Sequence, residues 1–127
     1  MDTRDLHDRG KKLRVEMFGH EAVEKRTAAL GAFGEPLQHI INAYAYGDVW
    51  SRSALPPPTK SLVMVAMMAA AGRDKELRVH LQGAVKNGCE PEEIQEVLLL
   101  LAMYCGIPAA NEAHAIAVDV LREAGKA

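Results

Sequence analysis

The sequence predicts an all-α protein, a bundle of about six to seven helices. The 127 residues are rich in alanine and leucine and include six methionines, all strong helix formers, whereas aromatic residues make up only 5%. No segment shows the period-two alternation of β-branched or aromatic residues that is typical of strands. Glycine and proline fall between the apolar segments, where helices end and begin.

Each expected helix is bounded by glycine, proline or a capping residue. The expected helices span residues 3–17, 21–31, 35–46, 58–71, 74–86, 90–106 and 109–124. The first carries Leu6, Leu13 and Met17 on one stripe. The third begins near Pro36, which is favourable in the first turn of a helix, and we expect Gly47 to end it.

The segment from residue 48 to residue 58 is the clear loop of the sequence. Pro56, Pro57 and Pro58 remove successive backbone donors and disfavour a helix before them. We expect a connection rather than a domain boundary, because each side alone is small for an independent core. Residues 1–127 are therefore expected to form a single domain.

The second half of the chain is punctuated in the same way. Asn87-Gly88 is a helix-stop signal after the fifth helix. The sixth helix begins at Pro91, with Glu92 in its first turn, where the helix dipole favours acidic side chains. Pro108 opens the seventh helix.

The fourth and sixth helices are apolar on nearly every face, over residues 62–71 and 97–104. A helix of this kind lies in the centre of a core or at a subunit interface. We expect these two helices to be the most buried. A chain of this length has limited room to bury both, so we also expect several copies to associate through symmetric contacts.

Composition excludes several classes of function. The net charge is −2, so there is no basic excess to neutralise nucleic-acid phosphates. The two cysteines cannot form a disulfide framework, and the histidines show no metal-binding spacing. No apolar run reaches the roughly 20 residues of a membrane span, and the N-terminus lacks a secretory signal. We expect a soluble, reduced, cytoplasmic protein that binds no metal, nucleic acid or membrane.

The best candidate for chemistry is a group on the fifth helix. Glu76 and His80 are four residues apart and share a helix face, and Arg73 precedes Glu76 by one turn. A carboxylate beside an imidazole raises the proton affinity of the ring, which suits proton transfer near neutral pH. The alternative interpretation, favoured by spacing alone, is a solvated pair on a polar face.

Two further segments contain candidate binding residues. Trp50 and Arg52 beside the proline loop could hold a planar anion, because the guanidinium matches a carboxylate in a two-pronged way. The more common interpretation is that Trp50 anchors the loop and Arg52 is solvated. The corner containing Tyr104 and Cys105 is expected to be a packed turn with a buried, inert thiol. Cys89 lies next to an acidic residue, which would not lower its pKa.

Taken together, these segments resemble the carboxymuconolactone decarboxylase family over nearly the whole chain. The stretches that carry the resemblance include Tyr46-Gly47-Asp48-Val49-Trp50-Ser51-Arg52, Gly72-Arg73, Glu76-Leu77-Arg78-Val79-His80, Asn87-Gly88 and Tyr104-Cys105-Gly106-Ile107-Pro108-Ala109-Ala110-Asn111. The resemblance implies the helical fold shared with alkylhydroperoxidase D and a ring-shaped homo-oligomer, usually a hexamer built as a trimer of dimers.

The same resemblance separates two branches of the superfamily. The peroxidase branch carries C-x-x-C-x-x-x-H on the helix that corresponds to the fifth helix here. His80 matches the histidine, but Arg73 and Glu76 occupy the cysteine positions. The decarboxylase branch is therefore the closer likeness. A thiol peroxidase using Cys105 and a non-catalytic binding member of the fold are the alternatives.

One departure concerns the sixth helix. Many members of the decarboxylase branch have a histidine or glutamine shortly before the Tyr-x-Gly corner, whereas this chain has leucine at positions 98–101. If the polar residue of those relatives touches substrate, this chain acts on a different ligand, or binds one without turnover.

By resemblance, the expected activity is the loss of CO2 from a small lactone carboxylic acid in aromatic-compound breakdown, with 4-carboxymuconolactone as the model substrate. The reaction needs no cofactor, because the lactone itself accepts the electron pair. His80 is the expected proton donor and Glu76 its orienting partner. The expected substrate-binding residues are Arg73, Trp50, Arg52, Tyr104 and Cys105, and a pocket shared between subunits would bring Trp50 and Arg52 toward His80 of a neighbour.

Overall fold

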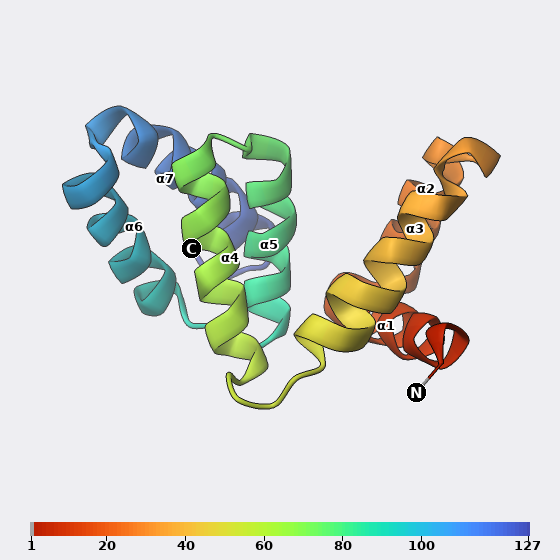
Figure 1. Cartoon of the computed structure of the whole chain (residues 1–127). Coiled ribbons are helices and arrows are strands. Elements are labelled where there is room, and N and C mark those ends of the chain that lie inside the picture. The colour runs from red at the N-terminus through yellow and green to blue at the C-terminus, as the bar shows by residue number, and fades with distance from the viewer. Residues whose placement is uncertain (1) are drawn as a thin grey trace. The chain divides into compact units, whose positions relative to one another are not determined.

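The computed structural model describes residues 2–127 and confirms the all-α class (Figure 1). These residues form seven α-helices, a 3₁₀ turn and a π-helical segment, with no strand among them. The elements are α1 (Thr3–Phe18), α2 (His20–Leu30), η1 (Ala32–Gly34), α3 (Glu35–Ile40), η2 (Ile41–Trp50), α4 (Pro57–Ala71), α5 (Asp74–Lys86), α6 (Pro91–Cys105) and α7 (Ile107–Glu123). No helix within residues 2–127 has both the length and the apolar character of a bilayer span.

The predicted helix boundaries agree with the structure to within a few residues, except in the third helix. That helix does not end at Gly47: it continues as π-helix through η2 to Trp50. Gly47 is there because another helix lies close to it. A Cβ atom at Gly47 would overlap the carbonyl oxygen of Leu6, and one at Gly10 would overlap that of Asn42. The two glycines let α1 and η2 pack backbone to backbone.

The connection over residues 51–56 separates two compact units and is shorter than the expected loop, because η2 runs to Trp50 and α4 already begins at Pro57. Unit 1 comprises Met1–Leu55 and unit 2 comprises Pro56–Ala127. In unit 1, α1 packs against η2, and α2 packs against α1.

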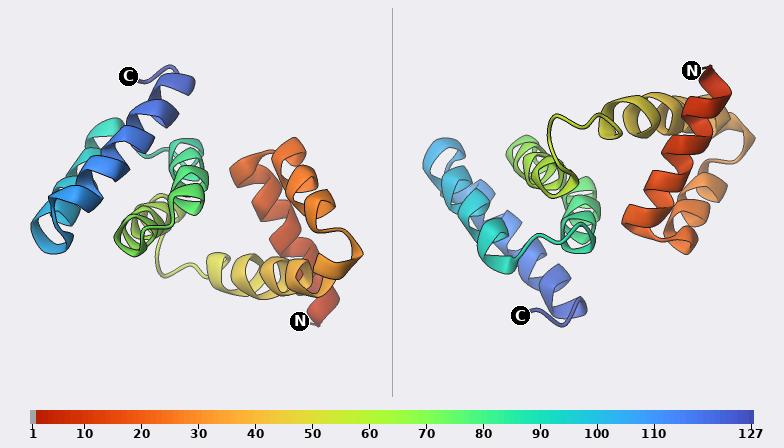
Figure 2. Two further views of the ribbon diagram at one scale, coloured as in Figure 1. Left: turned by 90° about the horizontal axis from the view of Figure 1, so that it is seen from above. Right: turned by 90° about the horizontal axis from the view of Figure 1, so that it is seen from below.

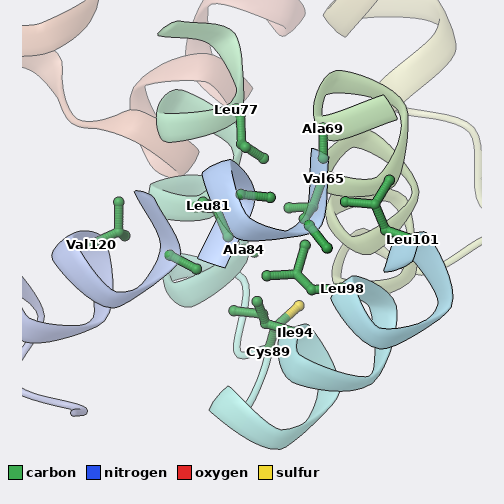
Figure 3. Packing of buried hydrophobic residues seen from close by; sticks show 13 residues of the cluster. Val65, Ala69, Leu77, Leu81, Ala84, Cys89, Ile94, Leu98, Leu101 and Val120 are labelled. Atoms are coloured by element: carbon green, nitrogen blue, oxygen red, sulfur yellow. The ribbon is translucent and has the colours of Figure 1, made fainter. Parts of the chain in front are cut away.

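Unit 2 is a four-helix arrangement (Figures 1 and 2). Helix α4 packs against α5 and α6, and α7 packs against α5, α6 and α4. The core draws aliphatic side chains from all four helices (Figure 3). Ala110, Ala113 and Ala117 form the buried stripe of α7, and their small side chains allow close approach of the neighbouring helices.

Helix α5, rather than α4 or α6, contributes the most buried residues to unit 2, so the expectation for α4 and α6 is wrong for the single chain. Helix α4 buries only Ser61, Val65 and Ala69, which recur every four residues. Helix α6 buries a similar stripe and exposes other apolar residues: Leu100 is 61% exposed and Met103 is 73% exposed. The apolar surface that the sequence shows on these helices is therefore available for contact with other molecules.

Helix α5 is held at both ends. It follows α4 through Gly72, whose left-handed backbone (φ 71°) allows the backbone N–H of Arg73 to bond the carbonyl of Met68 at 2.9 Å. At its C-terminal end, Nδ2 of Asn87 donates to Oγ of the fully buried Ser61 at 2.9 Å. The register of α5 against α4 is thus set by two local contacts in addition to the core.

We predict that Gly10→Ala destabilises unit 1 by about 1–3 kcal/mol, because the new methyl group meets backbone that cannot move aside without separating α1 from η2. Urea unfolding followed by the fluorescence of Trp50, the single tryptophan, reports the change. Lys12→Ala on the exposed side of α1 is the control and should shift the free energy of unfolding by no more than about 0.5 kcal/mol. Equal midpoints for the two variants would contradict the close crossing.

Candidate active site

His80 lies in the middle of α5 and is mostly buried, with 8% of its surface exposed. It neighbours the core residues Leu77 and Leu81 on the same helix, and its Nδ1 atom is completely enclosed. The apolar stripe of α5 therefore fixes the position of the imidazole. A histidine buried in this way is not a solvated surface residue, in contrast to the alternative of a solvated pair on a polar face.

Glu76 lies one turn before His80 and is exposed. Within residues 2–127, the structure shows no hydrogen bond or ion pair between the two side chains. The helical spacing predicted from the sequence is present, but the expected hydrogen bond or ion pair is not.

Arg73 occupies the N-cap position of α5, and its side chain is exposed. It forms no ion pair among the described residues, so its guanidinium is available to an anion. Arg78, on the same helix, bonds Asp119 at 3.0 Å and Glu123 at 3.4 Å on α7. This network joins α5 to α7, so Arg78 serves the structure of unit 2.

Tyr104 and Cys105 lie at the C-terminal end of α6, and the expectation of a buried thiol in this corner is wrong. Tyr104 is 86% exposed and Cys105 is also exposed. Gly106 turns the chain sharply here (φ 102°), so the last residues of α6 project away from the core. Both residues line a groove of about 540 Å³ between α4 and α6.

The groove between α4 and α6 is apolar. Its lining residues are Thr59, Leu62, Val63, Ala66, Met67, Ala70, Val97, Leu100, Leu101, Tyr104 and Cys105. Within the leucine run at positions 98–101, Leu98 is buried in the core, Leu101 is buried at the base of the groove, and Leu100 is exposed at its side. The groove has no charged side chain, so it suits apolar contacts better than it suits a carboxylate.

Cys89 is buried, whereas Cys105 is exposed. It is 1% exposed, and its Sγ lies 3.3 Å from the carbonyl oxygen of Pro58. Burial, and secondarily the charge of Glu93, raise the pKa of Cys89. Both cysteines are free thiols. Because α5 has no cysteine pair, a dithiol peroxidase mechanism has no counterpart here.

Trp50 and Arg52 belong to unit 1. Trp50 is 8% exposed, and its ring stacks on Tyr46 with the centroids 5.6 Å apart. Arg52 is exposed and forms an ion pair with Asp48 at 3.1 Å, one helical turn earlier. Trp50 thus packs within unit 1, while Arg52 keeps its charge at the surface.

Unit 1 also contains a polar group that sequence reasoning missed. Arg14 is buried, and its Nη1 bonds the side-chain oxygens of Gln38 and Asn42. The sequence contains a usable signal: Arg14 occurs with Gly10 and Met17 at the spacing of a buried helical stripe, where a charged residue is unusual. Among residues 2–127, no group of three or more His, Cys, Asp or Glu side chains is arranged to hold a metal ion.

Comparison with known proteins assigns the family. The sequence model of the carboxymuconolactone decarboxylase family matches residues 35–119 of this chain. The matched range includes α5, the turn at Gly106 after α6 and the connection between the two units. The chain belongs to the carboxymuconolactone decarboxylase family. The resemblance inferred from the residue pattern is thereby confirmed.

Individual family members show the same likeness over most of the chain. The sequence is 36% identical to 4-carboxymuconolactone decarboxylase of Acinetobacter baylyi, covering 98% of this chain and 93% of that protein. It is 33% identical to nitrosuccinic acid decarboxylase npaB of Metarhizium robertsii, covering 94% of this chain and 84% of that protein. Peroxisomal protein 2 of Schizosaccharomyces pombe is 27% identical over 81% of this chain but only 50% of its own length.

We predict that iodoacetamide modifies Cys89 only when unit 2 unfolds. The reactive species is the thiolate, and burial both raises the pKa of Cys89 and blocks access to its sulfur. Peptide mass spectrometry after timed labelling at neutral pH measures the modification, and the same labelling in urea is the control. Rapid, complete labelling of Cys89 in the folded protein would contradict the packing described for the start of α6.

Proposed function

We propose that this chain is a decarboxylase of small dicarboxylic acids, with 4-carboxymuconolactone as the first candidate substrate. The observation that carries the proposal is 36% identity to an enzyme of that name across 98% of the chain and 93% of the relative. A match of this extent leaves no large part of the relative uncovered. His80, mostly buried on a well-anchored helix, supports the proposal from the structure.

The names of the two decarboxylase relatives point to a shared chemistry. Nitrosuccinic acid and 4-carboxymuconolactone both lose CO2 from a carbon that also bears a CH2–COO⁻ arm. In each, the electron pair left behind is delocalised by a group already in the substrate, the nitro group or the unsaturated lactone. We propose that the substrate of this chain has the same features. Such a substrate supplies its own electron sink, so we expect no cofactor.

With 4-carboxymuconolactone, the reaction has two steps. The bond between the ring carbon and its carboxylate breaks, and its electron pair forms a new ring double bond. The former double bond shifts toward the lactone carbonyl, whose oxygen takes the negative charge. The carbonyl then re-forms as the carbon next to it takes a proton, which gives the enol-lactone of 3-oxoadipate. The protein must bind carboxylates, stabilise the oxyanion and deliver one proton.

His80 is the proposed proton donor. Its ring is mostly buried on the anchored helix α5, and an imidazole can both donate and accept a proton, as each turnover requires. Glu76, one helical turn away, is proposed to favour the charged imidazolium through its negative charge. Arg73, at the start of the same helix, is proposed to attract the substrate carboxylates.

The remaining proposed contacts with substrate come from Trp50, Arg52, Tyr104 and Cys105. Arg52 is proposed to bind a carboxylate and Trp50 to contact the substrate beside it, both reaching toward the His80 helix of a neighbouring copy. Tyr104 and Cys105 are proposed to supply apolar and weakly polar contacts. We further propose that the two units work as one domain, because the family match runs without interruption across the loop between them.

We predict that His80→Ala lowers kcat for 4-carboxymuconolactone by about 10²–10⁴-fold, because the proton donor is lost. Ultraviolet absorbance of purified protein mixed with the lactone follows the reaction. His20→Ala removes a histidine that is exposed on α2 and serves as the control, with an unchanged rate.

Circular dichroism of both variants should match that of the original protein. Undiminished turnover by a folded His80→Ala protein would place the proton donor elsewhere. Absence of turnover by the original protein, despite binding of the lactone, would favour a non-catalytic member of the family.

We propose that the protein is a homo-oligomer, a hexamer arranged as a trimer of dimers, in which the groove between α4 and α6 meets another copy. The groove is lined by exposed apolar residues that a soluble monomer rarely leaves open, including Val63 (43% exposed), Met67 (47%), Leu100 (61%) and Tyr104 (86%). We also propose that the protein works in the cytoplasm, in the breakdown of aromatic compounds.

We predict that Leu100→Glu lowers the mass of the particle measured by light scattering, because it places a charge in a desolvated contact. Gln95→Glu adds the same charge at an exposed position of α6 outside the groove and should leave the mass unchanged. A mass of one chain for the original protein at micromolar concentration would contradict the oligomer.

A further inference from the structure

Arg14 is a buried residue of unit 1, and its guanidinium has no negative partner among residues 2–127. Only 5% of the residue is exposed. Its Nη1 donates to Oε1 of Gln38 at 3.0 Å and to Oδ1 of Asn42 at 2.8 Å. Both acceptors are neutral amides that are themselves more than nine-tenths buried. These bonds satisfy one nitrogen of the guanidinium and leave its charge uncompensated.

The acidic side chains of unit 1 do not supply the missing charge. No carboxylate among residues 2–127 forms an ion pair with Arg14. Glu24, on the neighbouring helix α2, instead pairs with Lys11 at 3.4 Å and lies 3.7 Å from His20. Burial is the main cause that lowers the pKa of Arg14, and the positive charge of Arg26 lowers it further, while Tyr46 opposes them. Buried charges in proteins are ordinarily paired with an opposite charge. The guanidinium of Arg14 has no such partner among the described residues, so it lacks a counterion.

Arg14 has donors left for such a counterion. Nη1 uses both of its protons on the two amides, which leaves Nε–H and the two protons of Nη2. These atoms make no hydrogen bond within residues 2–127, and they are not among the completely enclosed side-chain atoms without a partner, so this edge of the guanidinium is narrowly open rather than sealed. The Nε–Nη2 edge is the planar fork that binds the two oxygens of a carboxylate.

The surroundings hold this fork in place. The guanidinium lies over the ring of Tyr46, 5.7 Å from its centroid. Nδ2 of Asn42 lies 3.2 Å from Nε2 of His7, and an amide nitrogen can only donate, so Nε2 is the acceptor and Oδ1 of Asn42 must face Arg14. The orientation of Asn42 is thus set before any ligand arrives, and preorganised donors bind anions more tightly.

We propose that Arg14 is the centre of a carboxylate-binding site in unit 1, which takes a small organic carboxylate on the Nε–Nη2 edge. Arg26, 5.4 Å from the ring of Phe18, adds a second positive charge near the site. The ligand supplies the counterion that the fold lacks. The proposal concerns binding alone and stands whether or not the chain is a decarboxylase.

Trp50 provides a direct readout, since its ring stacks on Tyr46, over which Arg14 lies. The experiment is a titration of the full chain with succinate at constant ionic strength, followed by tryptophan fluorescence and by calorimetry. We expect a saturable change in tryptophan fluorescence and a saturable heat of binding as succinate is added. Arg14→Lys should weaken succinate binding by about tenfold, because a lysine keeps the charge but loses the fork. Arg4→Gln, on the exposed side of the same helix, is the matched control and should bind as the original protein does.

Three results would overturn the proposal. The first is no saturable fluorescence change and no saturable heat with succinate in the original protein, which would leave Arg14 as a purely structural residue. The second is equal succinate affinity in the folded Arg14→Lys protein. The third is tighter binding of inorganic phosphate than of succinate, which would exclude a carboxylate site. If circular dichroism shows that Arg14→Lys does not fold, the Arg26→Gln variant tests the proposal instead. Unchanged succinate affinity in Arg26→Gln would contradict binding of the anion between the two positive charges.

Discussion

The burial of one face of α5 is the interaction on which the rest of unit 2 depends. Leu77, Leu81 and Ala84 recur at helical spacing and pack into a core shared with α4, α6 and α7 (Figure 3). The turn at Gly72 and the bond from Asn87 to Ser61 fix the same helix at its two ends. His80 lies on the same helix and is 8% exposed, so the anchoring of α5 also positions the residue that we propose as the proton donor.

The apolar groove of unit 2 and the buried cation of unit 1 are different kinds of surface. The groove between α4 and α6 carries no charged side chain, whereas unit 1 encloses the cation of Arg14 among neutral amides and aromatic rings. An uncharged groove suits contact with another protein surface, and a buried cation suits a small anion. The uncharged groove is consistent with the proposed assembly of several copies. The buried cation of Arg14 is the basis of the proposed carboxylate site, which the groove could not provide.

Sequence patterns predicted the helices well because their ends are determined locally, by proline, glycine and capping residues such as the Glu90–Glu93 box at the start of α6. They failed where a segment distant in sequence determines the local structure. Gly47 is typical of a helix end, yet the helix continues through it, and glycine is required there because α1 crosses η2. Cys105 reads as buried, yet the turn at Gly106 leaves it exposed. The position of His80 on α5 could be predicted, whereas the burial of Arg14 depends on Gln38 and Asn42, more than twenty residues away in the sequence.

The central claim is that CO2 is lost first and that His80 then returns a proton to one carbon. Turnover of 4-carboxymuconolactone in D2O tests it most directly, with the product examined by mass spectrometry and by NMR in the presence of a chiral solvating agent, which distinguishes the two configurations at a CHD carbon. The account predicts one deuterium per product molecule, on the carbon beside the lactone carbonyl and in a single configuration, because a fixed imidazolium delivers it from one face. A product with no deuterium at that carbon, or with equal amounts of both configurations, would contradict it.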